Sequence, residues 1–462
     1  MQLFGHYVPR RMLAVLGVEG FILVACIYLA LAWNGGLLGE GLLPGTVVAA
    51  DVLVAALLGL MAMAVLGLYD GTAIGRVSAV VPRLLVALGL ALGLMAAVAT
   101  IQPGWLPAPN ALAPGYAFAL VGLSAERIAF TKVADTAAWK PRVLVLGTGT
   151  RAASVGQVPG GELPYRVIGY LPPDGVFQHG VPDDQVVTLG GGRRLVNFVR
   201  EHRVDEIVAA VRDRRGALPM EELLECRLDG VAVTDVSRFF ERERGQIRLE
   251  SVNASGLIFG DGFRQDRLRG TVKRAFDLVT STTLLIVSLP VMLAAALAIK
   301  LDSAGPVFYR QDRVGRGGRP FRIYKFRSMR QDAEKDGVAR WAQTDDDRVT
   351  RVGKVLRLLR IDELPQVFNV LKGEMSFVGP RPERPCFVKE LGALIPYFHS
   401  RHSIRPGITG WAQVRYPYGA SVEDGYEKLQ YDLYYVKNHT LFLDLLILIE
   451  TVKVCLLGKG AR

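Results

Sequence analysis

Two adjacent carboxylates, Asp362 and Glu363, lie between basic residues in the C-terminal part of the sequence. Arg357 precedes them and Arg381 follows them. An acidic pair that opens a helix has an ordinary explanation, because aspartate can cap a helix N-terminus and acids in the first turn interact favourably with its dipole. The surrounding cations make a chemical role the better explanation.

This combination of residue types suits phosphoryl transfer. A reaction between a diphosphate donor and a phosphate acceptor brings several negative charges together, and cations or a divalent metal must neutralise them. A covalent route also needs an activated nucleophile, which a carboxylate can supply. The sequence therefore indicates a reaction centre at the acidic pair.

A β-hairpin is expected to position part of this centre. Residues 306–314 and 319–329 have the pattern of two strands around the glycine-rich turn 315–318. Such turns can bind phosphate through backbone N–H groups, but this one more simply closes the hairpin. We therefore expect the strand cations Lys325 and Arg327 to contact phosphate, and the acidic pair to open a later helix.

Four motifs occur in order in this region: Lys325-Phe-Arg-Ser-Met329, Asp362-Glu-Leu-Pro-Gln366, Val378-Gly-Pro-Arg-Pro-Glu383 and Arg405-Pro-Gly-Ile-Thr-Gly-Trp-Ala-Gln413. Together they resemble the bacterial sugar transferases, or polyprenyl-phosphate phosphoglycosyl transferases. The resemblance extends over about residues 270–460. The whole organisation is similar to the large members that start exopolysaccharide, capsule or O-antigen repeat units.

The resemblance implies transfer of a sugar-1-phosphate from a UDP-sugar to undecaprenyl (polyprenyl) phosphate. Asp362 would attack the sugar-linked phosphate, release UMP and carry the phosphosugar covalently. Glu363 would pair with it, and both carboxylates would help to hold Mg²⁺ or position the acceptor. A homodimer is also suggested. Substrate or phosphate contacts are implied for Lys325, Arg327, Arg357, Arg381, Glu383, Arg405 and Gln413.

Two other functions stay open. Asp345 and Asp347 have the spacing of the metal-binding D-x-D of a conventional glycosyltransferase, which would release UDP. The second alternative is a non-catalytic scaffold for polysaccharide assembly. The intact Asp362 and Glu363 argue against a scaffold.

The composition indicates a membrane protein. Half of the 462 residues are hydrophobic and the mean hydropathy is +0.26, which is high for a soluble chain of this size. The net charge of +11 would suit nucleic acid, anionic lipid or phosphorylated substrates. With no recognisable nucleic-acid module, we expect lipid and phosphate partners and no nucleic acid. The four scattered cysteines predict neither disulfides nor a zinc site.

Four N-terminal segments have the length to cross a bilayer, which takes about 20 apolar residues. Loops 34–43 and 102–110 contain no Lys or Arg, so the positive-inside rule places both ends of this bundle in the cytoplasm. Glu19, inside the first span, is expected to be interfacial or paired with another helix. The spans are residues 12–33, 44–68, 80–101 and 111–131. The flanking cations are Arg10, Arg11, Arg76, Arg83, Arg127, Lys132, Lys140 and Arg142.

A fifth apolar segment, residues 278–299, has basic residues on both sides, so both flanks look cytoplasmic. Pro290, close behind Ser288, removes a backbone hydrogen bond and bends a helix. We therefore expect a re-entrant membrane helix over about residues 277–300, broken at Ser288 and Pro290, rather than a kinked full span. Residues 441–457 carry too much charge to span and predict a helix on the membrane surface.

The middle of the chain alternates between strand and helix patterns, which is typical of a parallel α/β sheet. The G-x-G-x-x-A element at residues 147–152 follows the first strand, as in dinucleotide-binding domains. Alone this motif is weak, and we favour a Rossmann-like fold without a cofactor. The expected strands are 142–146, 166–170, 206–211 and 231–234, and the expected helices are 193–203 and 218–228.

The sequence thus predicts three domains. Residues 1–135 form a four-helix transmembrane bundle, residues 141–262 an α/β Rossmann-like cytoplasmic domain, and residues 265–462 a monotopic α/β catalytic domain with the re-entrant membrane helix. The expected location is the bacterial inner (cytoplasmic) membrane, with the catalytic domain on its cytoplasmic face. The expected partners are a UDP-sugar, undecaprenyl phosphate and the lipid bilayer.

Overall fold

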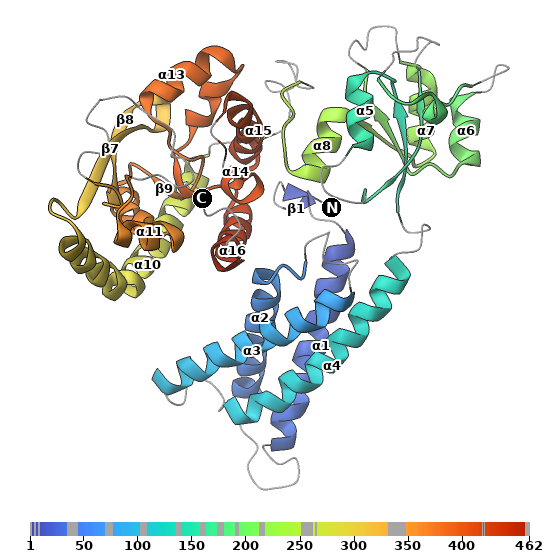
Figure 1. Ribbon diagram of the computed structural model, residues 1–462. Helices are drawn as coiled ribbons and strands as arrows, with labels where there is room; N and C mark the ends of the chain where they lie inside the picture. Colours follow the sequence, from blue (N-terminus) through green and yellow to red (C-terminus); the bar gives the residue numbers. More distant parts are fainter. Residues whose placement is uncertain are drawn as a thin grey trace. The chain divides into compact units, whose positions relative to one another are not determined.

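Figure 1 shows the computed structural model. Its chain forms two compact units, Val8–Phe239 and Phe240–Arg462, and Gln2–Tyr7 belongs to the second. The boundary falls inside the helix α8 (Val236–Arg244). The three-domain division stays a prediction. The structure describes residues 2–3, 6–7, 10–34, 45–69, 77–101, 109–134, 140–157, 163–172, 180–189, 194–211, 218–250, 262–263, 266–330, 348–417, 419 and 421–457.

The N-terminal part of the first unit is a bundle of four helices: α1 (Arg10–Asn34), α2 (Gly45–Val65), α3 (Val77–Ile101) and α4 (Pro109–Ala134). Apolar side chains such as Leu23, Ala55 and Leu84 form its core. Within the described part of this bundle, α1 and α3 are long and apolar enough to cross a membrane, and α2 contributes a shorter apolar stretch. This supports a membrane protein with several apolar helices. Four spans, and an orientation that depends on loops almost wholly outside the described residues, stay predictions.

A buried ion pair joins two helices of this bundle. Glu19 Oε1 accepts from Arg127 Nε at 2.6 Å, and Arg127 Nη1 donates to the carbonyl of Leu68 at 2.9 Å. The pairing expected for Glu19 is therefore confirmed. Arg127, a cation expected to flank the fourth span, lies inside the bundle because a carboxylate on α1 neutralises it.

The α/β part of this unit is a parallel sheet with the strand order β4-β3-β5-β6. Leu144 and Ile207 on the strands pack against Phe198 and Leu223 on the helices, so the predicted parallel α/β fold is confirmed. The strands are β3 (Arg142–Leu146), β4 (Arg166–Leu171), β5 (Glu206–Ala209) and β6 (Ala232–Asp235), and the helices are α5 (Thr150–Gly156), α6 (Leu195–Glu201) and α7 (Met220–Leu228).

Backbone groups of the glycine-rich turn after β3 are hydrogen-bonded to other parts of the same domain. The N–H of Gly147 donates to the carbonyl of Leu171 at 2.8 Å, and the N–H of Gly180 donates to the carbonyl of Thr148 at 2.9 Å. A bound pyrophosphate would need close access to such a turn. These contacts favour a Rossmann-like domain without a dinucleotide, which stays a prediction.

The second unit contains one long helix, a hairpin, a short parallel strand pair and several helices around a core that includes Trp411, Tyr434 and Phe398. The two-stranded β1 (Gln2–Leu3) and β2 (His6–Tyr7) pair lies in the N-terminal segment. The remaining elements are α10 (Arg267–Asp302), β7 (Phe308–Val314), the 3₁₀ helix η5 (Arg316–Gly318), β8 (Pro320–Phe326), α11 (Arg351–Leu358), the 3₁₀ helix η6 (Ile361–Gln366), α12 (Val367–Lys372), β9 (Ser376–Val378), α13 (Pro385–Leu394), the 3₁₀ helix η7 (Phe398–Ser403), β10 (Gly407–Thr409), α14 (Trp411–Arg415), α15 (Val422–Asn438) and α16 (Leu441–Leu457).

The apolar segment expected to re-enter the membrane lies in α10, a helix of 36 residues, which corresponds to about 54 Å. Helical structure continues through Ser288 and Pro290, so the expected break is not seen. The Ser288 hydroxyl donates to the carbonyl of Leu284 at 2.6 Å, a contact that bends helices. A bend and a re-entrant path stay predictions.

Candidate active site

The hairpin presents Lys325 beside the acidic pair. In β8, Ile323 and Phe326 are buried in two apolar clusters. Lys325, which lies between them in the sequence, is half-buried. Asn369 on α12 fixes this strand: its Oδ1 accepts from the N–H of Tyr324 at 3.0 Å, and its Nδ2 donates to the carbonyl of Arg322 at 2.7 Å. Because α12 follows η6 directly, the hydrogen bonds of Asn369 hold the strand β8 beside the acidic pair.

Asp362 and Glu363 lie in the first turn of η6. Arg360, with φ of 58°, occupies the N-cap position and has a left-handed conformation, which is uncommon for a non-glycine residue. The ordinary capping explanation therefore does not apply to Asp362. Only 8% of Asp362 and 9% of Glu363 are exposed, so both carboxylates are placed where charges interact strongly.

Two cations contact the same carboxylate oxygen of Glu363. Lys325 Nζ lies 2.7 Å and Arg381 Nη2 lies 2.9 Å from Oε1 of Glu363. Although burial opposes ionisation, these two cations, with the help of Arg360, hold the pKa of Glu363 well below its ordinary value. Burial lowers the pKa of Lys325, and Glu363 counteracts this. Glu363 is therefore the member of the pair whose ionised form the site favours.

Asp362 has the opposite tendency. Burial raises the pKa of Asp362, and the negative charge of Glu363 adds to this, while Lys325 and Arg357 act against it. Two neighbouring carboxylates with pKa values pushed in opposite directions are typical of a site with divided chemical roles. Asp362 is the more basic carboxylate of the pair, which suits a nucleophile at phosphorus.

Arg327 does not join this cluster. Its guanidinium donates to the carbonyls of Ser303 and Ala304 at 2.7 and 2.9 Å, at the C-terminal end of α10. β8 ends at Phe326, so the alternation that would place Arg327 on the same face as Lys325 no longer holds there. The guanidinium instead satisfies carbonyls that the helix end leaves without partners.

The remaining expected residues have other partners, and Arg357 acts on Asp362 through its charge. Arg313 Nη1 lies 3.6 Å from Glu383 Oε2, and Gln413 Nε2 donates to the carbonyl of Ile408 at 3.2 Å. Burial lowers the pKa of Arg405, and repulsion from two neighbouring guanidinium groups adds to the effect. The structure thus brings Lys325, Asp362, Glu363 and Arg381 together, and substrate roles for the other residues stay predictions.

The third and fourth motifs meet through their glycines. β9 and β10 are parallel, with Ser376 opposite Gly407. A Cβ atom at Gly407 would lie 2.1 Å from the backbone nitrogen of Gly379. This close approach of two backbone segments, which we call the glycine crossing, therefore needs glycine. The N–H of Gly379 donates to the carbonyl of Thr409 at 2.9 Å. The crossing fixes the start of the loop that carries Arg381.

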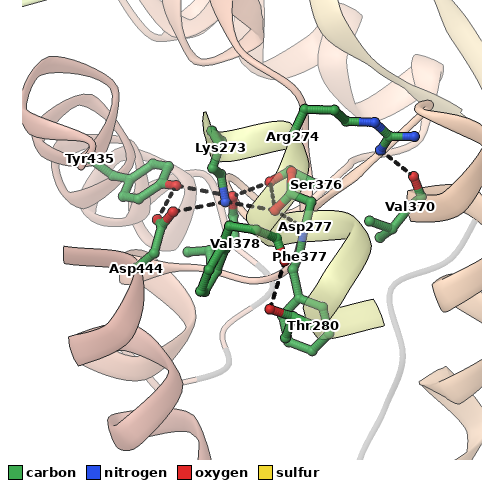
Figure 2. A network of polar contacts seen from close by, with 11 residues as sticks. Lys273, Arg274, Asp277, Thr280, Val370, Ser376, Phe377, Val378, Tyr435 and Asp444 are labelled. Carbon is green, nitrogen blue, oxygen red and sulfur yellow. Dashed lines mark hydrogen bonds and ion pairs between the residues drawn. The ribbon is translucent and has the colours of Figure 1, made fainter. Parts of the chain in front are cut away.

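A second network, shown in Figure 2, ties this strand pair to α10. Lys273 Nζ lies between two buried carboxylates, 2.9 Å from Asp277 Oδ1 and 2.8 Å from Asp444 Oδ2. Asp277 Oδ1 also accepts from the Ser376 hydroxyl at 3.0 Å, at the start of β9. The Tyr435 hydroxyl contacts Asp444 at 2.6 Å. Lys273 and Asp277 together therefore link α10 to α16 and to β9.

Sequence reasoning missed Asn369 and Asp277. Asn369 is fully buried within the apolar run Val367–Leu371, and Asp277 is fully buried at the start of the apolar part of α10. A polar residue inside an apolar run must find a hydrogen-bonding partner. This signal was available in the sequence, although it names no partner.

The described residues contain no cluster of three or more His, Cys, Asp or Glu side chains that could hold a metal. Asp345 and Asp347, the D-x-D of the alternative function, lie outside the described residues. Two neighbouring carboxylates are nevertheless suitable donors for Mg²⁺, which is commonly held by one or two carboxylates together with substrate phosphates.

Comparison with known proteins identifies relatives of this chain. The bacterial sugar transferase family model matches residues 268–458. The chain is 45% identical to a UDP-N-acetylgalactosamine-undecaprenyl-phosphate N-acetylgalactosaminephosphotransferase of Aeromonas hydrophila over 56% of this chain and 61% of that protein. The chain thus spans less than two thirds of this relative, and the match is longer than the region matched by the family.

Two smaller relatives are covered more fully. A UDP-glucose:undecaprenyl-phosphate glucose-1-phosphate transferase of Caulobacter vibrioides is 46% identical over 41% of this chain and 71% of its own length. An exopolysaccharide production protein of Rhizobium leguminosarum bv. phaseoli is 43% identical over 41% of this chain and 98% of its own length. The motifs, the paired carboxylates and these matches agree: the chain belongs to the bacterial sugar transferase family.

Proposed function

We propose that the protein transfers a sugar-1-phosphate from a UDP-sugar to undecaprenyl phosphate, or a related polyprenyl phosphate, and releases UMP. The observation that carries this proposal is the division of roles between Glu363, held charged by Lys325 and Arg381, and its more basic neighbour Asp362. The names of the Aeromonas and Caulobacter relatives support both substrate classes.

In the first step, a carboxylate oxygen of Asp362 attacks the phosphorus that carries the sugar. The bond from this phosphorus to the bridging oxygen breaks, and UMP leaves with the bonding electron pair. In the second step, a phosphate oxygen of the lipid attacks the same phosphorus, and the bond to Asp362 breaks. The product is a lipid-linked sugar diphosphate, and the carboxylate is regenerated.

Lys325 and Arg381 supply the positive charge that this route requires. Their side chains are 17% and 29% exposed, so each could exchange part of its contact with Glu363 for a phosphate oxygen. Fixed cations in a partly desolvated site stabilise the charge that develops in phosphoryl transfer. Arg357 adds a cation whose field already lowers the pKa of Asp362.

Mg²⁺ would be held by Asp362 and Glu363 together with the donor diphosphate. The fit rests on the donor set, because these are adjacent buried carboxylates of the kind that Mg²⁺ prefers. When bound, the ion would neutralise the diphosphate charge. The protein groups orient the donor and keep Glu363 ionised.

The apolar surface of α10 and α11 is suited to a membrane. Ile286 and Val287 are 67% and 72% exposed on α10, and Leu358, which follows Arg357, is 67% exposed on α11. Cations beside exposed apolar side chains are typical of elements at a bilayer surface. This arrangement would place the acidic pair at headgroup level on the cytoplasmic face of the inner membrane, with α10 re-entering the bilayer. A homodimer stays a prediction.

Identification of the released nucleotide tests the proposal. Purified full-length protein is incubated with Mg²⁺, undecaprenyl phosphate and either UDP-glucose, UDP-galactose or UDP-N-acetylgalactosamine. UMP release with one donor, lost in Asp362→Asn, is the expected result. Release of UDP that survives Asp362→Asn would contradict it and favour the D-x-D mechanism through Asp345 and Asp347, and no turnover with any donor would favour a scaffold.

A further inference from the structure

Residues 241–249 precede the family match, which starts at residue 268, yet they are part of the second unit. The indole Nε1 of Trp411 donates to the carbonyl of Gly245 at 2.7 Å in a buried position. Gly245 has a φ of +60°, and a Cβ atom there would lie 2.9 Å from the Trp411 ring. The glycine is therefore required both by the backbone and by the indole.

A second contact fixes the same segment to α15. The N–H of Ile247 donates to the carbonyl of Gln430 at 3.1 Å, and Gln246 Nε2 donates to Glu427 Oε2 at 2.9 Å. Ile247 and Leu249 are 4% and 8% exposed within the core of this unit. These buried apolar side chains and hydrogen bonds make the segment an integral part of the unit.

The first contact leads toward Arg381 through the glycine crossing. Trp411 follows Gly410, and a Cβ atom at Gly410 would lie 2.2 Å from the carbonyl oxygen of Gly379. The neighbouring Thr409 carbonyl accepts from the N–H of Gly379. Displacement of the indole would therefore reach the backbone two residues before Arg381.

The second contact leads to the same residue through α15. Gln430 lies two residues before Asp432, whose Oδ2 is 2.7 Å from Arg401 Nη2. The same Arg401 nitrogen donates to the carbonyl of Arg381 at 3.0 Å. Arg401 and Asp432 are 6% and 2% exposed, so this link has little freedom.

We propose that residues 241–249 are a positioning element for Arg381, acting through Trp411 and through α15. The inference rests on the proposed function, because it assigns to Arg381 a role in that reaction. Arg381 shares Oε1 of Glu363 with Lys325, so an error in its position would alter both the charge on Glu363 and the binding of donor phosphate. Small misplacements in such sites cost about 10- to 100-fold in rate.

The test uses the full-length chain. Gly245→Ala forces a Cβ atom against the Trp411 ring, and Trp411→Phe keeps a ring but removes the donor to the Gly245 carbonyl. Gly230→Ala is the matched control, because Gly230 also has a positive φ, +91°, but no atom lies within 4 Å of the added Cβ. Each change is combined with Arg381→Lys, and kcat/KM for UMP release is measured with the melting temperature.

Gly245→Ala is expected to lower kcat/KM about tenfold, Trp411→Phe less, and Gly230→Ala not at all. In the Arg381→Lys background both losses should shrink to near zero, because contacts that act through one residue are not additive. Equal losses in both backgrounds, or unchanged activity of both variants, would overturn the inference. If Gly245→Ala fails to fold, the Trp411→Phe cycle gives the answer. Absence of UMP from the unmodified protein would instead refute the proposed function.

Discussion

Lys325 Nζ lies 2.7 Å from Oε1 of Glu363, the second carboxylate of the acidic pair. Lys325 is on the strand β8, 38 residues before Glu363 in the sequence. Arg381 contacts the same oxygen from a third segment. Both cations therefore stabilise the ionised form of Glu363, while burial leaves Asp362 the more basic neighbour. This asymmetry separates a charged partner from a nucleophile.

Glu363→Gln should lower the free energy of unfolding by about 2 kcal/mol, because it leaves two partly buried cations without their shared counter-charge. Chemical denaturation of the detergent-solubilised protein measures this. Glu390→Gln is the control, since Glu390 is an exposed residue on α13. Equal free energies of unfolding of the two variants would show that the contacts of Glu363 with Lys325 and Arg381 contribute nothing to stability.

The acid side of the pH profile should report the ionisation of Asp362. The nucleophile must be ionised, so activity falls as the pH drops through its raised pKa. Arg357 lowers this pKa and Glu363 raises it. Arg357→Gln should therefore move the acid limb of kcat/KM to higher pH, and Glu363→Gln should move it to lower pH. Shifts in the same direction would contradict the assignment of Asp362.

Arg327→Gln should reduce stability without weakening donor binding. Its hydrogen bonds to the end of α10 involve a charged donor, and their loss should cost about 2 kcal/mol. The measurement compares the melting temperature and the KM for the UDP-sugar with those of Arg330→Gln, an exposed neighbour. A raised KM at unchanged stability would instead support the phosphate contact that the motif implies.

Lys273→Met should be severely destabilising, because Asp277 and Asp444 would stay buried without the cation that they share. Loss of one partner of such a buried cluster typically costs about 3 kcal/mol. Adding Asp444→Asn should recover part of this loss, since it removes one of the two stranded charges. Lys389→Met, at an exposed position on α13, is the control. Melting temperatures that do not differ between the two lysine variants would contradict a stabilising role for the network.

Local pattern predicted much of the secondary structure. Alternation and turn residues gave the hairpin, with β7 and β8 close to their expected ranges, and the parallel sheet of β3 to β6. The motifs also selected Asp362 and Glu363, which lie together with Lys325 and Arg381. These features depend on neighbours in sequence, which a sequence displays directly.

Partner choice could not be predicted in the same way. Arg327 is two residues from Lys325, yet the strand ends between them and the two cations take different partners. Residues 241–249 fall within the range predicted for the middle domain, 141–262, but the buried Ile247 and Leu249 belong to the core of the second unit. The partner of a side chain depends on which segments, distant in sequence, pack together. Local composition and periodicity do not contain this information.

The central claim is the covalent step at Asp362, and the mass of the protein tests it most directly. The full-length protein is incubated with Mg²⁺ and the preferred UDP-sugar, without lipid acceptor, then quenched and digested. We predict that one peptide containing Asp362 gains the mass of the sugar phosphate less one water, that undecaprenyl phosphate discharges the modified peptide, and that Asp362→Asn abolishes the modification. Turnover to lipid-linked product with an unmodified Asp362 peptide at every time point would contradict the account.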